Sequence, residues 1–488
     1  MAFDTEYDLV VIGSGASGKS AALTAARAGK SVVILEKMPE TGGLSVFAEG
    51  TAAFESSEQK RLGKPDHPDR HFPSKQEGYD KFMSYSHMRA NIDVVRAFVD
   101  NSAETIDIYK DLGVVYKTVT IAAYDDPNEV WTFHLPEGLG AHCQEVLLDA
   151  VQKAGVDIFV NTPAKSLIVE DGKVVGVEAL SDGEPLRVGG KAVILATGGM
   201  GSSPELLAKY SWAAPSAYNM NTLTPLQNVG EGMKMALEVG ADPTTITTCP
   251  LLAAGGRDMA MDSELGGAGV QPGAIWVNRT GKRFVSEGIA ENIGDIGPIY
   301  GKQPNGIVWA LLDQANMERL VESGSEISIG EFVVFGRPMK RLMTEIDGAL
   351  ESGLIKKADT VEELAKAMGV SVENLVATVE AYNKACETGD DQEFFKQQKY
   401  LRPLATAPFY AVPLATGTMG SAGGIRINGN MQVVTQEYEA IPGLYAVGLD
   451  ATGLYGDTYN MEVPGAANGF AHTSGRIAAR HAIATYMA

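Results

Sequence analysis

The sequence predicts an α/β fold, in which a parallel sheet flanked by helices is interrupted by an inserted α+β unit. Three observations lead to this prediction. Apolar runs of strand length alternate with helical stretches at both ends of the chain, as in a doubly wound sheet. A glycine-rich turn follows the first apolar run, and the texture of the sequence changes between about residue 241 and residue 400.

Bulk composition narrows the class of protein. The 488 residues are enough for two or more domains, because single cores stop growing near ~250–300 residues. The net charge of −21 disfavours nucleic acid and anionic membranes as partners. No apolar run is long enough to span a bilayer and no signal peptide opens the chain, so we expect a cytosolic, cytoplasmic protein. The three cysteines are far apart, which predicts no metal site.

The first segment, residues 7–37, has the order of a dinucleotide-binding βαβ unit. An apolar strand (residues 9–12) precedes glycines at G-x-G-x-x-G spacing, a helix of small residues follows, and a second strand (residues 32–35) ends in Glu36. The glycines let the backbone approach a pyrophosphate at the helix N-terminus, and Glu36 can accept from a ribose hydroxyl. The residues expected to bind here are Gly13, Ser14, Gly15, Ala16, Ser17, Gly18, Glu36 and Lys37.

The next stretch continues the same sheet. A glycine-rich stretch follows the acidic residue and contains Thr41, Gly42, Gly43, Ser45 and Gly50. It is expected to approach the rest of the dinucleotide, and the alternative is a plain loop. Residues 55–90 are polar and are interpreted as a surface excursion. Helices are predicted at 92–112 and 140–155, a strand at 156–160 and a hairpin at 163–178. A buried strand at 191–195 ends in Ala196, Thr197 and Gly198, small residues that leave room for a ligand.

The middle of the chain predicts an inserted domain. A hairpin with a glycine turn is expected at 274–284, and helices at 360–368 and 371–386, the second capped by Ser371. After residue 401 the sequence is core-like again, with a strand at 443–450 and a final helix that starts near residue 465. We therefore predict one domain from residues 1–240 and 401–488, built around an insertion at 241–400.

These motifs jointly resemble the flavoprotein subunits of fumarate reductase and succinate dehydrogenase and their soluble relatives, which include urocanate reductase and the 3-ketosteroid dehydrogenases. The resemblance rests on GSGASG with Glu36, on TGG at 41–43, on ATGG at 196–199, on VNRTGKRFVSE, and on PGLYAVGLDATG with the terminal GAANGF and SGRIA. It implies a Rossmann-like FAD-binding domain with an inserted α+β capping domain that closes over the isoalloxazine.

The resemblance also implies how FAD is held. FAD should be noncovalent, because the stretch 44–52 lacks the histidine that carries the flavin in covalent members. Ala164 would lie by the adenine, Asp450 by the ribityl chain, and Ala467, Asn468 and Phe470 at the flavin O2 edge. The remaining implied contacts are Gly42, Gly43, Ser45, Gly50, Ala196, Thr197, Gly198 and Gly448.

The chain departs from the family pattern where fumarate-reducing members bind a dicarboxylate. Glu291 stands in place of their arginine proton donor, Gly267 and Val270 in place of a relay pair, and Gly417 in place of a substrate-binding histidine. The stretch 457–463 contains no arginine. Because a dicarboxylate needs charge-assisted partners to offset its desolvation, these changes argue against fumarate or succinate.

The loop at 453–461 is the predicted substrate site. Tyr455, Asp457, Tyr459 and Glu291 are the candidate catalytic residues, and Cys249, Met419 and Met461 the candidate substrate-binding ones. Phenols can donate protons and methionine fits flat apolar groups, although the tyrosines can equally just shape the loop and Glu291 can be a plain surface residue. These residues, together with the missing dicarboxylate partners, predict a neutral substrate that is phenolic or polycyclic. The length of the chain and its N- and C-terminal sequences are similar to those of a reductase of equol-forming anaerobic bacteria. This resemblance would imply that the enzyme removes a hydroxyl from tetrahydrodaidzein.

Three other readings stay open. One is a ketosteroid-type dehydrogenase, and a second is another C=C reductase of the enoate or urocanate kind. The third is a non-enzymatic flavin electron carrier, against which the inserted cap argues, since a carrier needs no lid. No second dinucleotide fingerprint and no C-x-x-C-H haem motif is present. We therefore expect an external electron donor, either reduced nicotinamide or a redox partner.

Overall fold

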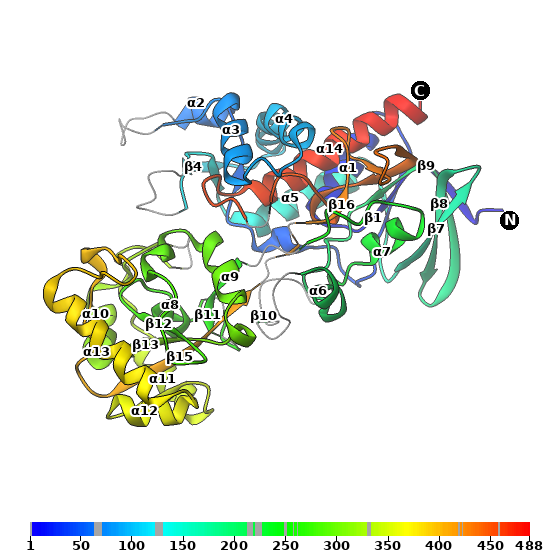
Figure 1. Cartoon of the computed structure of the whole chain (residues 1–488). Helices are drawn as coiled ribbons and strands as arrows, with labels where there is room; N and C mark the ends of the chain where they lie inside the picture. Colours follow the sequence, from blue (N-terminus) through cyan, green and yellow to red (C-terminus); the bar gives the residue numbers. More distant parts are fainter. Residues whose placement is uncertain are drawn as a thin grey trace.

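The fold is taken from a computed structural model, whose elements gather around two main sheets (Figure 1). The structure describes residues 2–62, 71–122, 130–211, 218–219, 227–247, 251–256, 258–260, 262–328, 333–417, 420–421, 423–456 and 459–488. Across these ranges, none of the helices combines the length and apolar character needed to cross a membrane.

The first sheet has a parallel centre, as predicted. Within the described residues its strands follow the order β17-β18-β9-β1-β2-β6, with β8 beside β9 and β7 beside β8. The bounds are β1 (Thr5–Ile12), β2 (Val32–Leu35), β6 (Asp157–Phe159), β7 (Ala164–Glu170), β8 (Lys173–Ser181), β9 (Glu184–Leu195), β17 (Gln432–Val434) and β18 (Ala440–Ala446). Strands from both ends of the chain thus meet, since β18 pairs in parallel with β9.

The helices of this body are α1 (Ala16–Arg27), α4 (Ile92–Asp111), α5 (Leu139–Lys153), α6 (Pro204–Tyr210), α7 (Glu231–Glu238) and α14 (Ala466–Tyr486). Of these, α1, α7 and α14 contact strands of the sheet, whereas α4 packs on α14 and α5 on α1. The final helix packs tightly on α1, because a Cβ on Gly475 would come within 2.2 Å of the Ser17 carbonyl oxygen. Leu9, Val10 and Val11 of β1 are fully buried, so the first strand lies at the centre of the core.

The segment 55–90, interpreted from sequence as a surface excursion, instead contains two helices in its described part. They are α2 (Ser57–Leu62) and α3 (Lys75–Tyr85). A capping box of Ser74 and Glu77 starts α3, and its Phe82 is fully buried against Phe54 and Phe98. The polar composition of this segment did not indicate α3, because only a few apolar residues, such as Phe82, pack the helix against the core.

A small sheet lies beside α14 and positions its N-terminus. It consists of β3 (Thr51–Ala52), β4 (Tyr116–Thr120) and β5 (Phe133–Pro136), in the order β3-β5-β4. The strands β16 (Ile425–Arg426) and β19 (Ala451–Thr452) pair in parallel and form a separate two-stranded sheet. Short 3-10 turns at Leu44–Phe47 and Gly448–Asp450 end the segments that approach the cavity described below, so the predicted strand at 443–450 stops at Ala446.

The second sheet is mostly antiparallel, and most of its strands lie within residues 241–400, the stretch predicted as an insertion. Its strands are β10 (Tyr218–Asn219), β11 (Leu251–Gly256), β12 (Ile275–Asn278), β13 (Val308–Asp313), β14 (Lys356–Ala358) and β15 (Phe409–Gly417). Because β15 lies in this sheet, its chain extends past residue 400, the boundary expected from sequence. Its helices are α8 (Glu264–Gly269), α9 (Ile293–Gly301), α10 (Gln314–Ser323), α11 (Leu342–Glu351), α12 (Val361–Met368) and α13 (Val372–Thr388).

A buried ionic cluster fixes the interior of this second body. Arg283 donates to the carboxylates of Glu287 and Asp391, with its side chain 2% exposed. Lys396 lies 3.3 Å from Glu287 and is fully buried. Burial opposes these charges, but the two cations hold the pKa of Glu287 below its usual value. The sequence motif KRFVSE is therefore structural at its Arg283 and Glu287 positions.

Candidate active site

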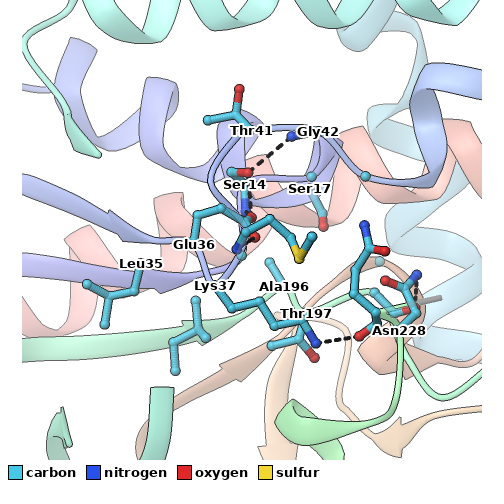
Figure 2. A pocket seen from close by; sticks show the side chains of 18 of the residues that line it. Ser14, Ser17, Leu35, Glu36, Lys37, Thr41, Gly42, Ala196, Thr197 and Asn228 are labelled. Atoms are coloured by element: carbon cyan, nitrogen blue, oxygen red, sulfur yellow. Dashed lines mark hydrogen bonds between the residues drawn. The ribbon is translucent and has the colours of Figure 1, made fainter. Parts of the chain in front are cut away.

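A cavity of about 350 Å³ opens where the carboxyl ends of β1, β2 and β9 meet (Figure 2). Most of the residues predicted to bind a dinucleotide line it. Those lining residues are Gly13, Ser14, Gly15, Ala16, Ser17, Glu36, Lys37, Thr41, Gly42, Gly43, Ser45, Ala164, Ala196, Thr197, Gly198 and Gly448. The position matches the crevice in which open α/β sheets bind ligands.

The floor of the cavity is bare backbone at the N-terminus of α1. Gly13 has a φ of +104°, and a Cβ there would lie 2.3 Å from the Ala196 carbonyl oxygen. Gly43 has a φ of +112°, and its Cβ would lie 2.9 Å from the Cα of Gly15. No acidic residue stands in the first turn of α1, so its free N–H groups and positive dipole end face the cavity without competition. This arrangement suits a pyrophosphate.

Glu36 is fixed at the end of β2. One carboxylate oxygen accepts from the Ser14 N–H at 3.0 Å and from the Ser14 hydroxyl at 2.5 Å, and the other accepts from the Met38 N–H at 2.9 Å. Ser14 in turn accepts from the Gly42 N–H at 3.3 Å, as Figure 2 shows. A carboxylate has about four acceptor positions, so one remains for a ribose hydroxyl.

Asp450 stands one layer behind the cavity wall. It accepts hydrogen bonds from the Thr197 N–H, from the Thr197 hydroxyl at 2.8 Å and from the Gly199 N–H at 3.1 Å. Complete burial raises the pKa of Asp450 to about 6, and the Glu231 carboxylate adds to that shift. Asp450 therefore holds the turn after β9 in shape.

The N-terminus of α14 carries an unsatisfied acceptor. Asn468 donates to the Gly50 carbonyl at 3.1 Å and to the Thr51 hydroxyl at 3.0 Å, while its buried side-chain oxygen has no hydrogen-bond partner within the described residues. The Ala467 N–H donates to the Tyr459 hydroxyl at 3.3 Å. A buried acceptor of this kind calls for an N–H or O–H donor from a ligand.

Three residues predicted to contact the dinucleotide are not among those that line the cavity, and each meets other protein atoms in its side-chain direction. A Cβ on Gly18 would lie 2.0 Å from the Gly13 oxygen, so this glycine serves helix–strand packing. A Cβ on Gly50 would lie 2.7 Å from the Phe133 ring. Phe470 is 4% exposed and its ring lies 6.1 Å from that of Phe98, inside the core.

The predicted substrate loop is braced by α3. The rings of Tyr455 and Tyr459 lie 5.1 Å apart with planes inclined by 32°. Lys81 of α3 forms an ion pair of 2.9 Å with Glu462, and the Asn460 amide donates to the Lys81 carbonyl at 3.3 Å. Tyr455 and Tyr459 therefore lie side by side next to α3, and neither they nor Met461 are among the residues that line the cavity. The predicted residues Cys249, Met419 and Asp457 lie outside the described residues.

The second body meets this loop through α9. A Cβ on Gly294 would lie 2.5 Å from the Tyr459 carbonyl oxygen, 3.0 Å from the Met461 Cγ and 3.1 Å from the Tyr85 hydroxyl. The Tyr85 hydroxyl is itself 3.4 Å from both the Asn292 and Asp295 side-chain oxygens. In Figure 1, α9 lies on the side of its body that faces the first sheet.

Sequence reasoning missed Tyr85 and its two partners. Tyr85 ends a helix in the polar segment 55–90, and Asn292 and Asp295 are more than 200 positions away along the chain. The S-x-x-E capping box at Ser74 was the local signal that could have shown a helix there. Glu291, the predicted acid, accepts instead from Lys399 at 2.8 Å and from the Tyr400 hydroxyl at 2.6 Å.

Comparison with known proteins identifies the family. Residues 8–463 match the family described as "FAD binding domain". The chain belongs to this family. It is 33% identical to the vinyl phenol reductase of Lactiplantibacillus plantarum, over 98% of this chain and 96% of that protein. It is also 27% identical to the 3-oxosteroid 1-dehydrogenase of Mycolicibacterium smegmatis, over 98% of each chain.

The solved structures agree with the fold. A flavocytochrome c3 fumarate reductase in its open conformation superposes with a TM-score of 0.72 at 26% identity, covering 99% of this chain and 79% of that one. The Rossmann-like FAD-binding fold predicted from sequence is thereby confirmed. The protein is a flavin-dependent oxidoreductase, an FAD-dependent reductase of the fumarate reductase family, and FAD is its cofactor.

The residues present fit FAD. The glycine floor leaves space for the pyrophosphate, and Glu36 has an acceptor position left for the ribose. The orphaned Asn468 oxygen suits a donor, which the pyrimidine edge of a flavin carries on a ring nitrogen. The positive end of the α14 dipole beside it stabilises negative charge on a reduced flavin.

Proposed function

We propose that this enzyme reduces a neutral phenolic substrate. The observation that carries the proposal is the 33% identity, along nearly the whole of both chains, to a protein named vinyl phenol reductase. A 4-vinylphenol is uncharged at neutral pH, flat and largely apolar. Tyr455, Tyr459 and Met461 offer such a ligand ring faces, hydroxyl groups and a polarizable thioether.

Three positions that carry dicarboxylate partners in fumarate-reducing relatives offer no cation among the described residues. Gly267 and Val270, which replace the relay residues of fumarate-reducing relatives, lie in an apolar interior. A Cβ on Gly267 would meet Val333 and Met339 at 3.5 and 3.7 Å, and Val270 is fully buried. Glu291, in the position of the arginine donor, is negative and already paired with Lys399. Two substrate carboxylates desolvated beside these three positions would gain no compensating cation from them.

Reduced FAD, when bound, supplies a hydride to the substrate. The chain's own task is to hold a phenol with its para carbon toward the flavin, to exclude water and to place a proton donor. A phenol para to the reacting carbon can share its electrons with that carbon through the ring. The same device serves two reactions: saturation of a para vinyl group, and loss of a para benzylic hydroxyl as water before hydride addition.

The finer proposal is the second of these reactions, with tetrahydrodaidzein as substrate and equol as product. Its benzylic hydroxyl lies para to a ring phenol, so protonation of the hydroxyl releases water and one hydride completes the reduction. The stoichiometry is one substrate and one two-electron-reduced flavin to one equol, one water and one oxidised flavin. Noncovalent FAD and an external electron donor, either reduced nicotinamide or a redox partner, complete the proposal.

A second candidate is supported by one relative. The 27% identity to a 3-oxosteroid 1-dehydrogenase over 98% of each chain favours a ketosteroid-type oxidation. That reaction runs in the opposite direction and loads electrons onto the flavin. The absorbance of the flavin distinguishes the two functions. A ketosteroid dehydrogenase loses the oxidised flavin absorbance when a 3-oxosteroid is added to the oxidised enzyme, whereas a phenol reductase regains it when the phenol is added to the reduced enzyme.

Product analysis under anaerobic turnover tests the proposal. The purified enzyme, with reduced viologen as electron source, is given 4-vinylphenol, tetrahydrodaidzein, urocanate and fumarate in parallel. We expect 4-ethylphenol or equol as the main product and no succinate. Products from fumarate or urocanate alone would refute the phenolic assignment, and 4-ethylphenol without equol would refute only the tetrahydrodaidzein part.

A further inference from the structure

The junction between the two bodies carries a tyrosine that the sequence did not reveal. Tyr85 is the last residue of α3 and belongs to the FAD-binding body, but its hydroxyl reaches the N-terminus of α9 in the cap. The Asn292 amide donates to this hydroxyl at 3.3 Å, and the Asp295 carboxylate lies 3.4 Å from it. The absent side chain of Gly294 is what permits this approach, as its Cβ would lie 3.1 Å from the hydroxyl.

The contacts of Tyr85 leave its hydroxyl available. Distances of 3.3 and 3.4 Å are long for hydrogen bonds that involve a hydroxyl, so a substrate oxygen or carbon can compete for the proton. Burial, the nearby Asp295 carboxylate and the more distant Glu462 raise the pKa of Tyr85 well above its usual value. The phenol therefore remains protonated at neutral pH.

The backbone holds Tyr85 against the substrate loop. A Cβ on Gly456 would lie 3.0 Å from the Ser86 carbonyl oxygen, so the end of α3 and the loop are in direct contact. His87 and Met88 follow with φ values of 52° and 60°, two successive left-handed residues that stop the helix.

We propose that Tyr85 is the proton donor of the reaction, completed as a donor only when α9 of the cap lies against the FAD-binding body. This inference rests on the proposed function. In vinyl reduction, Tyr85 would give its proton to one vinyl carbon, and reduced FAD, when bound, would supply the hydride for the other. In hydroxyl removal, the Tyr85 proton leaves with the hydroxyl as water and the hydride adds to the benzylic carbon.

Asp295 and Asn292 act as positioning residues in this scheme. After transfer, the Tyr85 phenolate takes back a proton from solvent, with Asp295 as the carboxyl that passes it on. Asn292 donates to the same oxygen and stabilises its transient negative charge.

The test compares Tyr85→Phe with Tyr79→Phe. Tyr79 lies on the same helix and is partly buried against the core of the FAD-binding body, so it receives the same chemical change away from the junction. Substrate affinity is measured from the flavin difference spectrum of the oxidised holoenzyme, and the rate from stopped-flow reoxidation of the reduced flavin by 4-vinylphenol. We expect Tyr85→Phe to bind within about threefold of wild type and to react about 100-fold more slowly, since a general acid contributes ~10²–10⁴-fold.

The outcomes separate the two proposals. A Tyr85→Phe enzyme that reacts at the wild-type rate overturns the donor assignment and leaves the phenolic function standing. A wild-type enzyme that no phenolic compound reoxidises overturns the proposed function itself. If Tyr85→Phe loses its flavin, Asn292→Ala replaces it as the probe, because it retains the tyrosine. We expect Asn292→Ala to slow the reaction and keep affinity, with a solvent deuterium isotope effect larger than that of wild type, and an unchanged rate and isotope effect contradict the scheme.

Discussion

Replacing Asp450 with asparagine should remove a pH dependence from the stability of the flavin-free protein. Burial raises the pKa of Asp450 from its ordinary value of 3.8 to about 6. The folded state therefore holds the proton more tightly than the unfolded state, and the contribution of Asp450 to stability falls as pH rises from about 4 to about 6. Between about pH 4.5 and about pH 7.5 the loss amounts to ~2 kcal/mol, since one unit is worth about 1.36 kcal/mol.

Asparagine resembles the protonated carboxyl and cannot ionise. Its fixed cost, from presenting an amide to the donors of Thr197 and Gly199, is the same at both pH values and cancels in the comparison. The assay is urea unfolding of the flavin-free wild type and variant, followed by far-UV circular dichroism. From the lower to the higher pH, we expect the free energy of unfolding of the variant to rise by ~2 kcal/mol relative to that of wild type. Parallel pH profiles of the two proteins would refute the reasoning.

Adding FAD extends the same experiment to the site. If the ribityl chain donates a hydroxyl to Asp450, as the family resemblance implies, bound FAD lowers the pKa of Asp450 and the difference between the two proteins shrinks. If Asp450 only holds the turn after β9, FAD leaves the difference unchanged. The comparison therefore decides between a direct contact and a supporting role.

Two glycine substitutions give further predictions. Gly13→Ala would place a Cβ 2.3 Å from the Ala196 oxygen, so we expect purified protein without the flavin absorbance band, whereas Gly29→Ala, at a positive φ but with nothing within 4 Å, should keep it. Gly294→Ala would place a Cβ 2.5 Å from the Tyr459 oxygen and should lower turnover at least tenfold with FAD retained, by about the cost of misplacing a catalytic group. The control Gly348→Ala in α11 places its Cβ in open space and should leave turnover unchanged. Equal turnover of wild type, Gly294→Ala and Gly348→Ala would contradict the role of the α9 contact.

Local chemistry could be predicted from sequence because its residues are close along the chain. Gly13, Glu36 and Ala196 each follow a strand directly, so their place at one edge of the sheet follows from the order of elements. The hairpin around Gly172 and the cap on the helix at Ser371 were predicted by the same short-range logic, and both are present.

The junction could not be predicted because it depends on tertiary packing. Tyr85 meets Asp295 only after α3 and α9 have each docked on different sheets, and nothing in either local sequence encodes that approach. Likewise β15 pairs with β13 in the second sheet, although its residues follow a return to core-like sequence. Phe470 was predicted from its motif as a flavin contact, and tertiary packing places its ring in the core beside Phe98.

The rate at which different compounds reoxidise the reduced flavin tests the central claim most directly. The holoenzyme is reduced anaerobically, mixed with either 4-vinylphenol or fumarate at equal concentration, and followed by the return of the oxidised flavin absorbance. We expect 4-vinylphenol to reoxidise the flavin at least about 100-fold faster, because burying two carboxylates without cationic partners would cost several kcal/mol. Faster reoxidation by fumarate would contradict the account.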